Sequence, residues 1–128
     1  ALSRIAEMES KLGANEAAWK TAGSIGNKAV QAQTLWRIVE IVAARGLAKE
    51  TARTTELAIA ATSKIESDFA RVWTMSDVAI ARVANGRRSE AAAAFIQALE
   101  ASEGLRNNWW RARALSRLAM ALRDLEQH

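Results

Sequence analysis

The stretch LWRIVEIVAARG, residues 35–46, returns forty residues later as MSDVAIARVANG, residues 75–86. Chemically similar residues occupy equivalent slots in both copies, and the gaps between these slots are three, eight and nineteen residues. The slots are Leu35, Ile38, Gly46 and Ile65 in one copy and Met75, Val78, Gly86 and Leu105 in the next. A repeat with this period indicates an array of helical supersecondary units.

The pattern extends toward both ends of the sequence. A further copy begins with Leu115 and Leu118. An earlier copy runs through Leu2, Ile5, Gly13 and Ile25. This earlier copy is seven residues shorter between its glycine and its last isoleucine. Because seven residues are close to two helical turns, we expect its buried face to survive the deletion.

The composition favours helices. The 128 residues include six glycines, no proline and no cysteine, and half of them are hydrophobic. The length is that of one domain, and the absence of cysteine excludes disulfides and thiolate metal sites. No apolar run is long enough for a membrane span, and no signal peptide is visible. The formal charge is +4, with 18 basic and 14 acidic residues interspersed, which predicts a mixed, solvated surface.

We expect seven helices, joined by connections so short that consecutive helices must pack antiparallel. Gly13, Gly46 and Gly86 should end three of them, Ser89 should cap the sixth, and Asn107 or Asn108 should cap the seventh. The expected spans are about 1–12, 15–23, 28–45, 48–66, 68–84 and 90–101, and the seventh helix should run from its asparagine cap to about 126. The predicted class is all-α, an α-solenoid forming one domain over residues 1–128. The chain opens directly in helical pattern without an initiator methionine, which suggests a piece of a longer array.

The repeat resembles the tetratricopeptide repeat, whose signature is W-x2-L-G-x2-Y, then Ala-x3-Phe, and later Pro. The matching residues in one copy are Met75, Val78, Ala79, Arg82, Ala91, Phe95 and Ala98. Those in the preceding copy are Leu35, Ile38, Val39, Val42, Thr51, Thr55 and Ala58. The resemblance covers the whole chain but is degenerate: the first aromatic slot is Leu or Met, and the closing proline is absent. A HEAT-like array is the alternative.

The sequence carries no pattern typical of an enzyme. Its single histidine is His128, it has no nucleophilic cysteine, and neither a G-x-G-x-x-G nor a G-x4-G-K-[ST] phosphate loop occurs. Paired acids such as Glu7 and Glu9 fall on predicted helices, where such side chains are usually solubilising. We therefore expect no catalysis, no cofactor and no metal site.

The resemblance implies a concave groove lined by the first helix of each helix pair. The partner-binding residues carried onto this chain are Arg4, Glu7, Gln33, Trp36, Arg37, Glu40, Trp73, Asp77, Arg113, Arg117, Met120 and Arg123. Trp36 and Trp73 should point away from the helix-pair core and act as interface anchors beside arginine. The alternative is that both pack against a neighbouring repeat. We assign Trp19, Trp109 and Trp110 to structure, with Trp109 and Phe69, forty residues apart, filling equivalent gaps between repeats.

These residues predict a protein-interaction scaffold. Arg4, Arg37 and Arg117 share one repeat slot, interrupted by Asp77, and such a ladder would suit an acidic peptide or a C-terminal carboxylate. The Lys/Asn clamp of some tetratricopeptide domains is not reproduced, so their chaperone partners are not inherited. RNA binding is one alternative, and self-association through exposed end helices is another. The compartment is open, with a soluble protein of the bacterial cytoplasm or periplasm expected.

Overall fold

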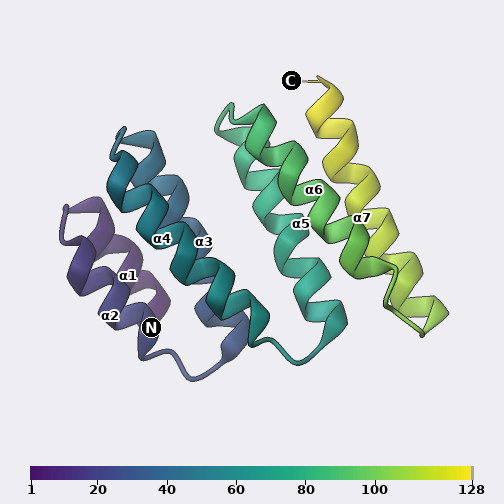
Figure 1. Cartoon of the computed structure of the whole chain (residues 1–128), viewed down its shortest axis with the longest axis horizontal. Helices are drawn as coiled ribbons and strands as arrows, with labels where there is room; N and C mark the ends of the chain where they lie inside the picture. The colour runs from purple at the N-terminus through teal and green to yellow at the C-terminus, as the bar shows by residue number, and fades with distance from the viewer. Residues whose placement is uncertain (128) are drawn as a thin grey trace. The chain divides into compact units, whose positions relative to one another are not determined.

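The computed structural model describes residues 1–127, and all their regular secondary structure is helical. His128 lies outside the described residues. The seven helices are α1 (Leu2–Lys11), α2 (Asn15–Gly23), α3 (Lys28–Ala44), α4 (Ala48–Ser63), α5 (Asp68–Ala84), α6 (Arg88–Ser102) and α7 (Asn108–Gln127) (Figure 1). The all-α prediction is confirmed for these residues. The largest difference in bounds is in α4, which ends at Ser63 rather than at 66.

The chain divides into two compact units, which are described separately. Unit 1, Ala1–Lys64, contains α1 to α4, and unit 2, Ile65–His128, contains α5 to α7. Within the units, α1 packs with α2, α3 with α4 and α5 with α6 as helical hairpins (Figure 1). In unit 1, α3 also packs on α1 and α2, and in unit 2, α7 packs on α5 and α6. That the two units form one domain stays a prediction.

A glycine closes the first helix of each hairpin. Gly13, Gly46 and Gly86 have φ values of 87°, 71° and 75°, a backbone region that residues with a Cβ rarely adopt. At the second of them, the Gly46 N–H donates to the Ala43 carbonyl and the Leu47 N–H donates to the Val42 carbonyl, at 3.0 and 3.1 Å. These two bonds form a Schellman motif, and the same pair recurs at the other two glycines. The repeat in the amino-acid sequence is therefore also a repeat of backbone conformation.

The turns explain where the second helix of each hairpin starts. Ala14, Leu47 and Arg87 each follow a Schellman glycine and act as N-cap without a capping side chain. The prediction that Ser89 caps the sixth helix is wrong, because the turn already leads the chain into α6 at Arg88.

Helices α3, α5 and α7 begin differently, each with a polar cap, and these caps are forty residues apart. The side-chain oxygens of Asn27 and Ser67 accept from the backbone N–H groups of Val30 and Ala70, at 3.0 and 3.2 Å. Asn107 accepts in the same way from Trp109 and Trp110, so Asn107 rather than Asn108 is the cap. Each such bond satisfies an amide that the start of a helix leaves unpaired.

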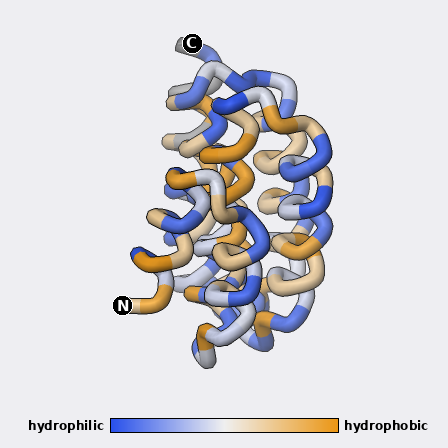
Figure 2. The backbone as a smooth tube through the Cα atoms, turned by 90° about the vertical axis from the view of Figure 1, so that its left-hand side faces the viewer, coloured by the Kyte–Doolittle hydropathy of each residue, from blue (hydrophilic) through white to orange (hydrophobic). Residues whose placement is uncertain are grey.

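The core repeats with the same period. Ala18, Ala58 and Ala98 are fully buried, and seven residues after each of them comes a buried Ile25, Ile65 or Leu105. The shortened first copy therefore keeps its buried face, as the deletion of about two turns predicts. Hydrophobic and hydrophilic stretches alternate along the chain in Figure 2, as expected for helices that are buried on one side. No helix in the described part of the chain has the length and apolarity needed to cross a membrane.

Candidate functional site

The predicted partner-binding residues fall into two sets, one in each unit. Unit 1 carries Arg4, Glu7, Gln33, Trp36, Arg37 and Glu40. Unit 2 carries Trp73, Asp77, Arg113, Arg117, Met120 and Arg123. The contacts within each unit decide which of these side chains form a surface.

Trp36 is a core residue of unit 1. Only 6% of it is exposed, and its Nε1–H donates to Thr62 Oγ1 on α4 at 2.8 Å. The expectation that Trp36 points away from the helix-pair core is therefore wrong. The indole bonds to the second helix of its own hairpin, whereas the alternative had placed it against a neighbouring repeat. The physical reason is that this slot of the first helix faces the second helix of its own hairpin. Ser76, forty residues later, occupies the same slot and is fully buried as well.

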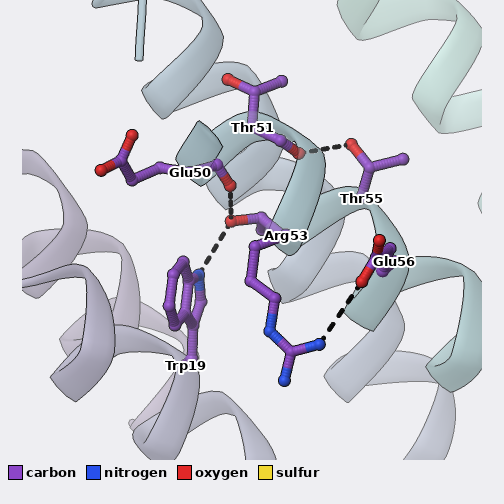
Figure 3. A network of polar contacts seen from close by, with 7 residues as sticks. Trp19, Glu50, Thr51, Arg53, Thr55 and Glu56 are labelled. Atoms are coloured by element: carbon purple, nitrogen blue, oxygen red, sulfur yellow. Dashed lines mark hydrogen bonds and ion pairs between the residues drawn. The ribbon is translucent and has the colours of Figure 1, made fainter. Parts of the chain in front are cut away.

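Trp19 also has a structural role, as predicted. Its Nε1–H donates to Thr54 Oγ1 at 2.8 Å, which links α2 to α4. The Thr54 hydroxyl in turn donates to the Glu50 carbonyl at 2.6 Å, and Thr55 donates in the same way to the Thr51 carbonyl at 2.7 Å (Figure 3). Thr54 therefore accepts from the indole while its own proton is used within the helix.

Two of the other predicted residues of unit 1 form an ion pair. Arg37 Nη1 lies 3.8 Å from Glu7 Oε2, joining α3 to α1, and the arginine side chain is largely exposed. An exposed pair of this kind contributes little to stability. Arg4 is exposed on α1, and Gln33 and Glu40 are half-buried on α3.

In unit 2, three predicted residues meet. The Arg117 guanidinium of α7 lies over the Trp73 ring of α5, with Cζ 4.0 Å from the ring centroid. The same guanidinium donates through Nη2 to Asp77 Oδ1, also on α5. Burial lowers the pKa of Arg117 from its ordinary value, because desolvation disfavours the cation. The carboxylate and the ring face both offset that cost and hold the arginine in place.

A row of aromatic rings continues from Trp73 along the same face. Phe69 lies 5.4 Å from Trp73 and 4.6 Å from Trp110, and Trp110 meets Trp109 edge-on at 4.5 Å between ring centroids. Arg113 covers the Trp109 ring at 5.0 Å. Trp109 is nevertheless 57% exposed, so the prediction that it fills a gap as Phe69 does is wrong. Phe69 is covered by two neighbouring indoles, whereas Trp109 stands at the end of the row.

Trp73, Trp109 and Arg113 from this row help to line a shallow, open depression of about 340 Å³, here called the α7 hollow. It is lined by Trp73, Trp109, Ala112, Arg113, Ser116, Arg117 and Met120. Four of the predicted partner-binding residues are among them. Arg123 is exposed further along α7 and lies outside the lining set.

Trp109 is the aromatic lining residue that sequence reasoning missed, and a signal for it was present. The α7 members of the hollow follow one another by three, one, three, one and three residues, from 109 to 120. That spacing places them on a single face of a helix. The forty-residue alignment with Phe69 instead suggested a core position.

The α7 hollow is cationic and aromatic. Residues 104–123 contain five arginines and neither aspartate nor glutamate. Arg117 is paired with Asp77, which leaves Arg113, held over an exposed indole, as the more accessible cation. Such a surface can bind a carboxylate through a guanidinium and an apolar side chain through the rings and Met120.

Comparisons with protein-family models, with curated proteins and with solved structures found no match. The geometry and chemistry of the α7 hollow therefore carry the functional proposal.

Proposed function

We propose that this chain is a protein-interaction module that binds an acidic peptide segment of a partner in the α7 hollow. The observation that carries the proposal is the joining of two tryptophans and two arginines on one face of unit 2. Tryptophan and arginine are the residues most enriched among interface hot spots. The proposal includes neither a chemical reaction nor a cofactor.

The two arginines have different roles in this proposal. Arg117 is fixed between Trp73 and Asp77, so it shapes the hollow and keeps the Trp73 ring in position. Arg113 lies over the largely exposed Trp109 and presents the guanidinium that a peptide carboxylate can reach. An apolar peptide side chain would cover Trp109 and Met120, both more than half exposed. Such contacts would bury apolar area that is now in water.

A tetratricopeptide-like α-solenoid, in which the first helices line a continuous groove, belongs to the same proposal. It is supported by the three Schellman turns and by the polar caps forty residues apart. Small-angle X-ray scattering tests it. A scattering profile of an elongated particle, about as thick as two packed helices, supports the solenoid. The profile of a compact globular particle contradicts it.

A peptide display library tests the binding proposal directly. We expect the selected sequences to combine aspartate or glutamate with a large apolar residue. The best synthetic peptide is then titrated against the wild type and against Arg113→Glu, which should bind at least about tenfold more weakly because attraction becomes repulsion. Trp109→Ala should weaken binding to a similar degree.

The matched control is Arg111→Glu, which makes the same charge change on an exposed residue of α7 that does not line the hollow. Its affinity should stay within about twofold of the wild type, with only the long-range charge effect lost. Equal losses of peptide affinity for Arg113→Glu and Arg111→Glu would contradict a binding site at the α7 hollow. Binding of single-stranded RNA with a steep loss of affinity in salt would favour the nucleic-acid alternative instead.

A further inference from the structure

The outer face of α1 in unit 1 is apolar and exposed where its repeat equivalents are buried. Ile5 is 52% exposed and Leu2 41%, whereas Ile38 and Leu35, in the same slots of α3, are 0% and 5% exposed. Exposed apolar patches on small domains often mark contact sites. The residues around this face indicate which kind of partner could bind to it.

The exposed face of α1 has the spacing of a coiled-coil seam. Ala1, Ile5, Met8 and Leu12 follow one another by four, three and four residues, which places them at successive d, a, d and a positions of a heptad. Together with Arg4 and Glu9 these four residues line one open depression. In the heptad frame Arg4 is a g position and Glu9 the following e position.

The flanking charges are complementary to a second copy of the same helix in one orientation. In a parallel pair, a g residue faces the e′ residue five positions later on the partner, so Arg4 meets Glu9 of the other copy, twice. In an antiparallel pair, g residues face each other, which would bring Arg4 against the cation of Lys11. The Thr21 hydroxyl donates to Glu9 Oε1 at 2.6 Å and so holds this carboxylate beside the seam.

We propose that the exposed face of α1, formed by Ala1, Arg4, Ile5, Met8, Glu9 and Leu12, is a homodimer interface that pairs two copies of α1 in parallel about a two-fold axis. The contact is isologous, because the same residues serve on both sides. A ten-residue helix is only about 15 Å long, so the interface lies below the size of a stable complex. We therefore expect a weak dimer with a dissociation constant on the order of 100 µM.

Charge reversal tests the interface. Sedimentation velocity from about 10 µM to about 1 mM covers both sides of the expected dissociation constant. The wild type should shift from monomer to dimer over this range. Arg4→Glu and Glu9→Arg should each weaken the dimer at least about tenfold, and the double variant Arg4→Glu/Glu9→Arg should restore it, because the two pairs are then opposite in sign again.

Circular dichroism at 222 nm checks that each variant keeps its helices. A wild type that stays monomeric throughout overturns the proposal. So does a double variant that remains monomeric while both single variants are folded, or an assembly larger than two chains.

The orientation has its own test, since the chain contains no cysteine. Ile5→Cys should form a disulfide-linked homodimer under mild oxidation, because a positions face each other in a parallel pair. A mixture of Ile5→Cys and Met8→Cys proteins should give mainly the two homodimers. A preference for the mixed dimer would show antiparallel pairing and overturn the parallel arrangement.

Discussion

The hairpin of α3 and α4 in unit 1 and the hairpin of α5 and α6 in unit 2 share a backbone plan but differ in chemistry. Their helices start forty residues apart, and both have a polar cap at the first helix and a Schellman glycine between the helices. The slots that are buried in one are almost all buried in the other. The residues in these slots nevertheless differ, as Val42 against Arg82 and Trp36 against Ser76 show.

The position of the tryptophan shows what this difference does. Trp36 occupies an inward slot and bonds to α4, whereas Trp73 occupies the slot of Gln33, which is half-buried in both units. The same side chain therefore stabilises one hairpin and remains available at the surface of the other. The backbone slot decides burial, and the choice of residue in a half-buried slot decides what the surface can bind.

Truncating the two tryptophans should separate these roles and have the largest effect. Trp36→Ala should lower the free energy of unfolding by about 3–5 kcal/mol, because it leaves a core cavity and removes the bond to Thr62. Trp73→Ala should lower it by about 1–2 kcal/mol, since the removed ring is only half-buried and its main specific contact is the arginine stacked on it. Urea unfolding followed by circular dichroism measures both. Trp36→Phe is the matched control and should fall between the two; equal losses for the two alanine variants would contradict the comparison.

Replacing the turn glycines should instead affect both hairpins alike. Gly46→Ala and Gly86→Ala should each lower the free energy of unfolding by about 1–2 kcal/mol, because alanine is strained at positive φ. No atom lies within 4 Å of the added Cβ at either site, so the cost is conformational. Gly23→Ala, in α2 and without positive φ, should be neutral or stabilising by up to about 1 kcal/mol. A loss confined to one hairpin would show that the turns are not equivalent.

Removing the ion pairs between first helices should give the smallest difference in stability between the two units. Asp77→Asn should cost about 1 kcal/mol, because Arg117 is also stacked on Trp73 and partly desolvated. Glu7→Gln should cost at most about 0.5 kcal/mol, since Arg37 is largely solvated. Thermal unfolding at low salt and at about 1 M salt measures both, and screening should reduce the difference. A larger loss for Glu7→Gln would reverse the order expected from burial.

The sequence predicts the helices well because turn residues and the spacing of apolar slots can be read without knowledge of tertiary contacts. Glycine at the left-handed turn and the forty-residue recurrence of apolar slots locate six of the seven helices within about one turn, and Asn107 identifies the start of the seventh. The failure at Ser89 has a tertiary cause, since the turn at Gly86 supplies the start of α6 without a capping side chain.

The site was harder to predict, because periodicity gives the angle of a residue around its helix but not what faces that angle. Trp36 follows buried Leu35, and only the presence of Thr62 on α4 shows that its direction is inward. Trp109 aligns with Phe69, but the indoles that cover Phe69 come from residues in other slots. Trp73, Asp77 and Arg117 meet as expected for neighbouring first helices.

The short second helix of the first hairpin shows that helix length and hairpin chemistry are separable. α2 has 9 residues and α4 has 16, and the difference of seven (16 − 9) equals the deletion in the sequence. The turn at Gly13 and the buried spacing from Ala18 to Ile25 are unchanged by it. The second helix of such a hairpin can therefore vary in length while the turn and the buried spacing stay the same. About 10 Å can be gained or lost in one step, while the connections at both ends continue to fit the neighbouring helices.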